Sequence, residues 1–374
     1  MPTDAKVLVT GGAGFIGSHL ADALLARGYR VRVLDALTEQ VHGKSRTFPA
    51  YLSREVEAVR GDVRNPDDVL RALEGVEAVF HFAAAVGVGQ SMYEIASYTD
   101  INNRGTAVLL EALLRRPVAK IVVASSMSIY GEGLYRAADG RLSSPRPRSL
   151  EQLKAGRWDL SDERGEPLEP VPTPESKPAA PESIYALSKY DQEMMFLMFG
   201  RCYGVPAVAL RFFNVYGERQ ALSNPYTGVL AIFAARYLNG RAPVIFEDGR
   251  QRRDFVHVRD LARGCVLALE KPDARDTVFN LGSGEARSIL EIAERLGAVL
   301  GRPHLKPEVR GRYRAGDIRN CFADISRAAA VLGYRPEVPL DTGLAELGEW
   351  LEGQRTEDRS ETADDELRRR GLVA

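Results

Sequence analysis

A glycine-rich turn between an apolar run and a helical pattern constrains the fold of this chain more than any other feature. Residues 6–10 are mostly apolar, and Gly11-Gly12-Ala13-Gly14-Phe15-Ile16-Gly17 follows them directly. Ile16, Leu20 and Leu24 then recur at helical spacing. Because glycine permits tight turns and close backbone approach, the segment predicts a strand, a turn and a helix in succession.

Short apolar runs alternate with helical patterns through the first half of the chain. Because parallel strands need crossover connections, this alternation predicts an α/β fold with a doubly wound (Rossmann) parallel sheet. After residue 217 the alternation weakens, which predicts a smaller mixed α/β lobe that binds the substrate. The expected strands are 6–10, 30–34, 78–82, 121–125, 205–213 and 277–281, and the expected helices are 19–26, 69–73, 105–114, 183–203, 229–238 and 288–300.

Changes in composition divide the chain further. The predicted parts are a sheet domain (1–220 and 255–285) with an insertion (132–182), a smaller lobe (221–254 and 286–353) and a charged tail (354–374). The insertion is rich in proline, glycine and charge, including Pro145-Arg146-Pro147-Arg148, so we expect no sheet element in it and a short helix within 150–160. The tail is charge-dense and poor in aromatic residues, which predicts fraying or disorder.

The charge balance narrows the classes of partner. The 374 residues carry a net charge of −1, which gives no general attraction for nucleic acid or an anionic membrane. The first residues do not resemble a signal sequence and no apolar run approaches the roughly 20 residues of a membrane helix, so we predict a cytoplasmic protein. Cys202, Cys265 and Cys321 are too few and too widely spaced for a disulfide framework or a zinc site, and no metal site is predicted.

The glycine turn also predicts a bound dinucleotide. Gly11 permits the tight turn, Gly14 lets the backbone approach a pyrophosphate, and Gly17 lets the helix close onto the sheet. Asp35 ends the second strand, where an acid accepts hydrogen bonds from ribose hydroxyls and repels a 2′-phosphate, which favours NAD over NADP. Asp62, after Val59-Arg60-Gly61, lies in the loop after a third strand that precedes the strand at 78–82, and it is a candidate contact for the adenine. A plain turn or cap role stays open for both aspartates.

Tyr185 and Lys189 lie four residues apart in a helical pattern that Ser183 is expected to cap, so both project from one face. A neighbouring ammonium and a positively charged nicotinamide would lower the pKa of a phenol toward the range of a general base. Ser126 ends the fifth strand, at the carboxyl edge where open sheets bind ligands. These residues predict proton transfer beside the dinucleotide.

Further motifs accompany these residues along the chain. They are His81-Phe82-Ala83-Ala84, Asn102 before Gly105-Thr106, Ser125-Ser126 before Tyr130-Gly131, Tyr185-Ala186-Leu187-Ser188-Lys189, Arg211-Phe212-Phe213-Asn214-Val215-Tyr216-Gly217, Arg253-Asp254-Phe255-Val256-His257-Val258 and Gly316-Asp317. On these motifs, about residues 5–352 resemble the extended short-chain dehydrogenases/reductases of the NAD-dependent epimerase/dehydratase family. The resemblance implies an enzyme with NAD as its cofactor and a nucleotide sugar as its substrate.

The resemblance also implies roles for individual residues. The implied catalytic residues are Ser126, Tyr185 and Lys189. The implied cofactor contacts are Gly11, Gly14, Phe15, Ile16, Gly17, Asp35, Asp62, Val63, Phe82, Ala83, Ala84, Asn102 and Lys189. The implied substrate contacts are Ser126, Met127, Tyr185, Asn214, Phe246, Arg253, Arg314 and Asp317. Arginine forks suit a diphosphate, while Met127 and Phe246 would suit an apolar sugar carbon and a stacked base, with a core role open for both.

Two positions after the implied catalytic hydroxyl bear on the reaction. The family shares a step in which the C4 hydroxyl loses its proton while hydride passes from C4 to NAD⁺. Related 4,6-dehydratases carry Asp and Glu where this chain has Met127 and Ser128, and related sugar-acid decarboxylases carry Glu in place of Ser128. The resemblance therefore favours a C4 epimerase, in which hydride returns to the other face of a 4-keto sugar.

Residues 183–199 and 214–228 are most similar to family members that interconvert dTDP-L-rhamnose and dTDP-6-deoxy-L-talose, which makes a dTDP-6-deoxyhexose the predicted substrate. A UDP-sugar or UDP-glucuronate 4-epimerase or decarboxylase stays open, as does a non-catalytic dinucleotide-sensing protein. Residues 103–114 and 190–199 are more apolar than one core face requires, which predicts a homodimer. Burial of these side chains within the monomer is the alternative.

Overall fold

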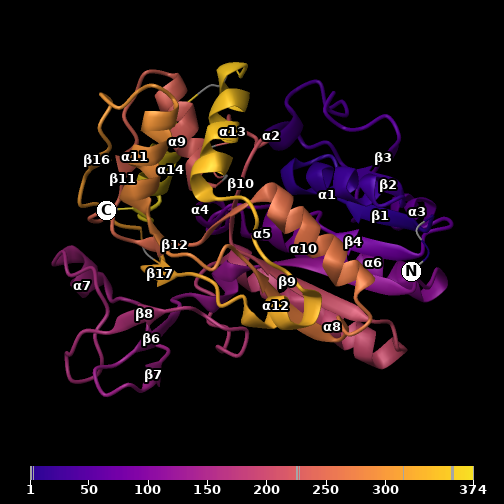
Figure 1. Ribbon diagram of the computed structural model, residues 1–374, viewed down its shortest axis with the longest axis horizontal. Coiled ribbons are helices and arrows are strands. Elements are labelled where there is room, and N and C mark those ends of the chain that lie inside the picture. The colour runs from indigo at the N-terminus through magenta and orange to yellow at the C-terminus, as the bar shows by residue number, and fades with distance from the viewer. Residues whose placement is uncertain are drawn as a thin grey trace.

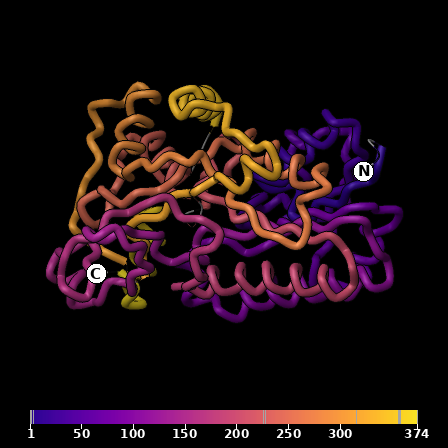
Figure 2. Tube along the Cα trace, turned by 60° about the horizontal axis from the view of Figure 1, so that its bottom comes forward, coloured from indigo at the N-terminus to yellow at the C-terminus, as the bar shows by residue number. Residues whose placement is uncertain are grey.

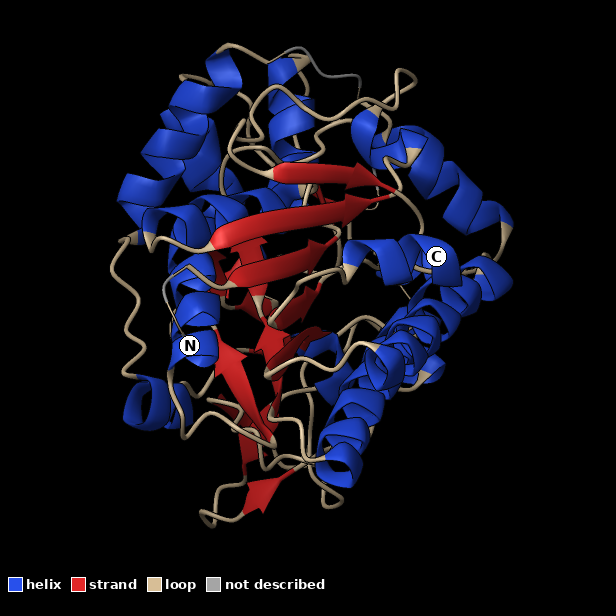
Figure 3. Cartoon of the chain, turned by 90° about the vertical axis from the view of Figure 1, so that its right-hand side faces the viewer, coloured by secondary structure: helices blue, strands red, loops and turns tan. Residues whose placement is uncertain are grey.

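A seven-stranded parallel sheet with helices on both faces organises the larger part of the molecule (Figures 1 and 3). The computed structural model describes residues 2, 4–224, 226, 228–314, 316–354 and 358–373. In spatial order the strands are β14 (Thr277–Leu281), β9 (Ala207–Phe212), β5 (Lys120–Ser126), β4 (Ala78–His81), β1 (Lys6–Thr10), β2 (Arg30–Asp35) and β3 (Glu57–Arg60). The order reverses between β1 and β4, as in doubly wound sheets that bind ligands at this point. The predicted fold class is confirmed.

Helices of the larger part pack against the two faces of the sheet. One face carries α1 (Phe15–Ala26), α10 (Val258–Glu270) and α12 (Ser326–Leu332), and the other carries α3 (Pro66–Ala72), α6 (Gly105–Arg115) and α8 (Ile184–Tyr203). Successive strand residues point to opposite faces, so Val7 and Val9 pack on the first face while Leu8 packs on the second. Shorter elements are α2 (Glu39–His42), α4 (Val88–Ser91), α5 (Ile95–Tyr98), the π-helix Thr99–Arg104 and the 3-10 helix Met127–Tyr130.

The smaller lobe has its own core and mixes short strands with helices. Its helices are α9 (Val229–Leu238), α11 (Ile289–Val299) and α13 (Leu340–Glu352), which contribute to one apolar cluster. The short strand sets are β10 (Asn214–Tyr216) with β13 (Phe255–His257), β11 (Val244–Ile245) with β16 (Glu308–Val309), and β15 (Arg287–Ser288), β12 (Arg252–Arg253) and β17 (Asn320–Cys321). The predicted mixed lobe is present, and the helix predicted at 229–238 has those bounds.

The insertion forms a small sheet of its own beside the smaller lobe (Figure 1). Its antiparallel strands β6 (Leu134–Arg136), β7 (Leu142–Ser143) and β8 (Glu169–Val171) follow the order β7-β6-β8, and α7 spans Leu150–Lys154. The helix within 150–160 is confirmed, and the insertion adds no strand to the central sheet. The expectation of no sheet element was wrong for the segment itself, because strands of two or three residues leave no periodicity in a sequence.

The expectation of a frayed or disordered tail was wrong for residues 360–369, which form α14 (Ser360–Arg369). Ala363 and Leu367, one helical turn apart, are buried while charged residues face outward. The Leu367 side chain lies so close to Gly89 that a Cβ there would come within 3.2 Å of it. Residues 355–357 and 374 of the tail lie outside the described residues.

The three cysteines carry free thiols, as expected, with Cys265 and Cys321 buried and Cys202 exposed. Across the described ranges, no group of three or more potential metal ligands is present. Within those same ranges, no helix combines the length and apolar character that a membrane crossing needs.

Candidate active site

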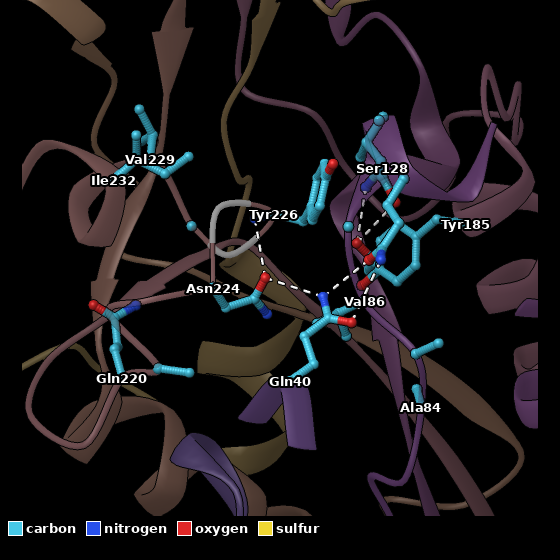
Figure 4. A pocket seen from close by; sticks show the side chains of 18 of the residues that line it. Gln40, Ala84, Val86, Ser128, Tyr185, Gln220, Asn224, Tyr226, Val229 and Ile232 are labelled. Atoms are coloured by element: carbon cyan, nitrogen blue, oxygen red, sulfur yellow. Dashed lines mark hydrogen bonds between the residues drawn. The ribbon is translucent and has the colours of Figure 1, made fainter. Parts of the chain in front are cut away.

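A cavity of about 1170 Å³ opens at the carboxyl ends of the central strands and extends to the smaller lobe. Figure 4 shows Ser128 and Tyr185 on one side of it and Val229 and Ile232 on the other. Every cofactor and substrate residue predicted from the sequence lines this cavity except Asn102. The structure therefore brings together residues from Gly11 to Asp317 in one site.

The glycine turn after β1 has the geometry that its sequence predicted. Gly11 has φ +70°, and a Cβ there would lie 2.8 Å from the backbone nitrogen of Ala83. At Gly17 a Cβ would lie 2.5 Å from the Gly11 carbonyl oxygen, so glycine is needed where α1 meets the turn. At Gly14 a Cβ would meet only that same oxygen, at 3.3 Å, so most of this face is open. The turn is a cradle that a side chain would fill.

The amino end of α1 faces this cradle without a side-chain cap. Gly14 is the N-cap and no acidic residue lies in the first turn, while Phe15, Ile16 and Gly17 line the cavity. Uncapped amides and the positive end of the helix dipole suit an anion such as a pyrophosphate. Phe82, Ala83 and Ala84 line the cavity from the end of β4. The residues present fit a dinucleotide.

Asp35 holds the glycine turn and also lines the cavity. Its Oδ2 accepts a hydrogen bond from the Ala13 amide at 3.1 Å, and its Oδ1 accepts one from the Leu37 amide at 2.9 Å. Its Oδ2 keeps a second acceptor site, while His42 Nε2 lies 3.5 Å from Oδ1. The capping role and the ribose role left open by the sequence are therefore compatible in one side chain.

Two predicted cofactor residues have partners that the sequence did not suggest. Asp62 lines the cavity beside Val63, but both of its carboxylate oxygens accept hydrogen bonds from Arg64, at 2.6 and 3.0 Å. Asn102 lies behind the cavity wall, where its amide exchanges hydrogen bonds with the backbone of Ala85 at 2.7 and 3.1 Å. The side chain of Asn102 therefore shapes the loop after β4 from outside the cavity.

The predicted hydroxyl groups meet at the end of β5. Ser183 caps α8, its Oγ accepting from the Ala186 amide at 3.1 Å, and this places Tyr185 in the first turn of the helix. The Ser126 Oγ accepts from the Ser128 hydroxyl at 2.9 Å and is also hydrogen-bonded to Tyr185. A phenol and a serine hydroxyl thus converge on one point of the cavity.

The residues of the chain do not by themselves lower the pKa of Tyr185. Burial raises the pKa of this phenol, and the hydrogen bond with Ser126 opposes that rise. The expectation that the neighbouring ammonium lowers it is therefore not met by the protein groups alone. Burial also lowers the pKa of Lys189 to about 7, against the opposing charge of Glu193.

Lys189 ends a buried chain of hydrogen bonds that runs back to β1. Its Nζ donates to Gln192 Oε1 at 2.8 Å, and Gln192 Nε2 donates to Thr106 Oγ1 at 2.8 Å. Thr106 contacts His81 Nε2 at 2.9 Å, and His81 Nδ1 lies 2.8 Å from the Thr10 hydroxyl. Burial lowers the pKa of His81 to about 3, so its ring is neutral. The chain fixes the lysine relative to the glycine turn.

A buried ion pair supports the serine edge of β5 from beneath. Arg211 on β9 holds Glu193 of α8 through two bonds, 2.6 Å to Oε1 and 3.0 Å to Oε2. Glu193 Oε2 also accepts from the Ser125 hydroxyl at 2.6 Å, and Arg211 donates to the Tyr130 hydroxyl at 2.8 Å. A buried pair of this kind tolerates the loss of neither partner. It ties α8, which carries Tyr185, to the end of the sheet.

The smaller lobe contributes the predicted substrate residues other than Ser126, Met127 and Tyr185. Arg253 is held by backbone carbonyls and lies 3.4 Å from Asp317 Oδ1, while the Arg314 guanidinium stacks on Phe246 at 4.4 Å. Buried polar atoms without a protein partner include Asn214 Oδ1 and Arg314 Nε, and both residues line the cavity. Asn214 Oδ1 needs a donor such as a sugar hydroxyl, and Arg314 Nε needs an acceptor such as a phosphate oxygen.

Met127 is buried beside the cavity in the cluster that contains Tyr130. Met127 therefore packs in the core and also forms part of the cavity wall.

Several lining residues were missed by the sequence analysis. Arginines occupy every second position at 310, 312 and 314, a spacing that could have indicated a basic face. Residues of α14 form a further wall of the cavity. Gln40 of α2 donates through Nε2 to Gln90 Oε1 of α4 at 3.0 Å and to Asn224 Oδ1 at 3.1 Å. Figure 4 shows Gln40 and Asn224 facing each other at the cavity. No local signal marks the residues of this bridge.

The molecule combines a Rossmann sheet, a glycine turn and a site at the carboxyl edge of the sheet that contains Ser126, Tyr185 and Lys189. These features define a protein of the short-chain dehydrogenase/reductase type. The chain belongs to the NAD dependent epimerase/dehydratase family, whose model matches residues 7–150 and 161–282. It is an enzyme of this family, and its cofactor is NAD.

Individual relatives are similar over almost the whole chain. The dTDP-L-rhamnose 4-epimerase of Burkholderia thailandensis is 36% identical over 92% of this chain and 94% of its own length. The UDP-glucose 4-epimerase of Thermotoga maritima, solved with UDP-glucose, has a TM-score of 0.75 at 32% identity and covers 93% of this chain and 98% of its own. That of Thermus thermophilus, in complex with NAD, has a TM-score of 0.75 at 31% identity and covers 94% and 100%.

Proposed function

We propose that the chain is a nucleotide-sugar C4 epimerase that works through a transient 4-keto sugar. The observation that carries the proposal is that Ser126 and Tyr185 converge in the cavity. The two residues after Ser126 in the sequence are Met127 and Ser128, and neither is a carboxylic acid. Elimination of water needs an acid and a base beside the sugar. Without such a pair at these positions, return of the hydride to C4 is the simplest outcome.

The residues have distinct roles in the proposed reaction. Tyr185 removes the proton from the C4 hydroxyl, and Ser126 donates a hydrogen bond to the same oxygen. Lys189, fixed by Gln192, supplies positive charge that stabilises the tyrosinate. When bound, NAD would supply a reversible hydride acceptor beside C4, and epimerisation requires that the hydride return to the other face of the sugar. Tyr185 then gives its proton back to the C4 oxygen, so that atoms and electrons balance and no external oxidant is consumed.

Binding is assigned to two groups of residues. The dinucleotide is held by Gly11, Gly14, Gly17 and Asp35. Further contacts along its length are Phe15, Ile16, Asp62, Val63, Phe82, Ala83 and Ala84. Asn102 supports the loop behind it. The sugar nucleotide is surrounded by Asn214, Arg253, Arg314 and Asp317, and Phe246 stacks on its nucleobase. Two arginines in an otherwise neutral protein suit a diphosphate.

The proposed substrate is a dTDP-6-deoxyhexose, with dTDP-L-rhamnose and dTDP-6-deoxy-L-talose as the pair that is interconverted. Similarity to the Burkholderia thailandensis enzyme supports this choice, and Met127 offers an apolar contact for a deoxygenated C6. The alternative is a UDP-sugar, including UDP-glucuronate with epimerisation or decarboxylation. The similarity to a structure solved with UDP-glucose favours that alternative.

The test is direct incubation of the purified chain with each substrate, followed by NMR of the sugar region. We expect a C4 epimer of dTDP-L-rhamnose to accumulate to equilibrium without added NAD⁺ being consumed. Conversion of UDP-glucose or UDP-glucuronate instead would select the alternative, and CO₂ release would identify decarboxylation. Failure to convert any of these substrates would overturn the proposed reaction.

A further inference from the structure

The insertion contacts the smaller lobe through one of two neighbouring arginines. In Pro145-Arg146-Pro147-Arg148, the side chain of Arg146 is exposed, whereas that of Arg148 is only 2% exposed. Arg148 does not line the cavity, and of the insertion residues only Glu182 does. A buried arginine within a surface insertion is costly unless it is paired, so its partners indicate its purpose.

The guanidinium of Arg148 joins two loops of the candidate site. Its Nη1 lies 2.8 Å from Glu247 Oε1, next to Phe246. Its Nη2 donates to the Asp317 carbonyl oxygen at 2.9 Å, and Nη1 also donates to the Trp158 carbonyl oxygen at 3.2 Å. One planar group therefore contacts the segments on both sides of the Phe246–Arg314 stack.

Glu247 depends on this arrangement. It is 1% exposed and has φ +54°, a left-handed conformation that is uncommon for a residue with a side chain. Its amide donates to the Arg312 carbonyl oxygen at 2.6 Å, and its Oε2 lies 3.0 Å from Arg319 Nη1. Each of the two arginines thus lies beside a different oxygen of this buried carboxylate, which belongs to the loop that carries Phe246.

A second contact anchors the same region to the start of the insertion. The Glu132 carboxylate accepts hydrogen bonds from the amides of Arg319 and Asn320, at 2.7 and 3.1 Å. Arg319 also pairs with Asp248 at 2.6 Å and with Asp159 of the insertion at 2.9 Å. The insertion therefore contacts residues 247 and 317–320 with charged groups from its start, Glu132, and from its middle, Arg148 and Asp159.

We propose that the insertion braces the nucleotide end of the site and that Arg148 is the positioning residue that sets the gap between Phe246 and the 316–318 loop. The inference rests on the proposed function, since it assigns that end to the base and diphosphate. Loss of Arg148 leaves Glu247 with one of its two cations. The loop that carries Phe246 then loses its fixed position, and nucleotide affinity falls while the chemistry at Tyr185 does not.

The experiment compares Arg148→Met with Arg146→Met, which makes the same change at the exposed arginine of the motif. Calorimetric titration of the NAD-loaded enzyme with dTDP and with UDP measures affinity independently of turnover. For Arg148→Met we expect affinity to fall about tenfold and KM for the sugar nucleotide to rise in parallel, with kcat within about twofold of the original. Arg146→Met should leave all of these values unchanged.

Arg148→Lys is the conservative variant and replaces Arg148→Met if the latter does not fold. Lysine keeps the charge beside Glu247 but cannot reach both loops with a planar fork, so we expect intermediate affinity. A lower melting temperature with unchanged dTDP and UDP affinity in these variants would overturn the inference by leaving Arg148 a purely structural role. If the unaltered enzyme binds neither nucleotide, the proposed function fails first, and that result is visible without any variant.

Discussion

At the scale of single residues, the candidate site depends on contacts between side chains far apart in the sequence. Lys189 is connected to Thr10 through Gln192, Thr106 and His81, with each contact between 2.8 and 2.9 Å. The spacing of Tyr185 and Lys189 could be interpreted from the sequence because both lie on one helix. The rest of the chain of contacts could not, because it comes from separate elements that only the folded sheet brings together.

Tyr185→Phe tests the proposed proton transfer. Loss of the phenolic hydroxyl removes the general base, so we expect kcat to fall by about 10²–10⁴-fold, with NAD binding retained. NMR of the sugar region measures epimerisation, and calorimetric titration with NAD⁺ measures binding. Tyr190→Phe, on the same helix and outside the cavity lining, is the control. Equal activity of the two variants would contradict the role given to Tyr185.

The buried imidazole of His81 predicts a loss of stability in acid. Its pKa is about 3 in the folded chain and 6.5 as the ordinary value, so between these values the unfolded chain binds a proton that the native chain does not. Stability is therefore lost as pH falls from about 6.5 toward 3, by up to roughly 1.4 kcal/mol per pH unit. Above pH 6.5 this group contributes no pH dependence.

Urea unfolding at several pH values, compared between the original chain and His81→Gln, isolates this contribution. The variant loses hydrogen bonds at every pH, but its unfolding free energy should change less steeply between pH 6.5 and 5. His304→Gln, at an exposed histidine, is the matched control and should keep the original slope. An unchanged slope in His81→Gln would show that the imidazole is not kept neutral.

At the scale of elements, α14 is the part of the site that sequence analysis missed. It lines the cavity opposite the arginines of the smaller lobe, and Asp364 Oδ2 lies 3.5 Å from Arg312 Nη1. Asp358 and Glu361 pair with Arg236 at 3.6 and 3.3 Å, which anchors the start of the helix. The helix thus presents acidic groups at the end of the site assigned to the diphosphate.

Asp364→Asn should strengthen nucleotide binding. The carboxylate lies in the field of Arg310, Arg312 and Arg314, which oppose the rise in its pKa caused by burial. Removing its charge frees these cations for a diphosphate, and we expect dTDP affinity to increase about two- to fivefold. Glu366→Gln on the same helix, whose carboxylate pairs with Arg370 and does not line the cavity, is the control. Weaker binding in Asp364→Asn would contradict the expectation.

The elements that could be predicted are those with long periodic signals. The strand at residues 6–10 and the helix at 229–238 have the predicted bounds, and Ser183 caps α8 as its type suggests. The helix after the glycine turn begins at Phe15 rather than at residue 19, because the turn itself supplies its N-cap. By contrast, α14 is amphipathic through only two buried side chains, and tertiary contacts rather than propensity determine that it forms.

At the scale of the whole molecule, one outer helix face has apolar side chains that the monomer does not cover. In Figure 2, α8 is the long helix along the lower edge. Leu197 lies in the core, but Leu187 and Met198 are 44% and 46% exposed. Leu114 at the end of α6 is 50% exposed as well. Burial within the monomer therefore accounts for only part of the apolar excess in these helices.

We expect this face to form a homodimer in which α8 and α6 of two copies pack together. A stable interface buries about 800 Å² per partner and places apolar side chains at its centre. Leu187→Lys combined with Met198→Lys puts two charges there and should give a mass of 41.1 kDa by light scattering, against twice that value for the original chain. Leu142→Lys with Leu150→Lys, at exposed leucines of the insertion, is the matched control and should stay dimeric. A mass of 41.1 kDa for the original chain at every concentration would show that the face stays in water, and its apolar side chains would then need another partner.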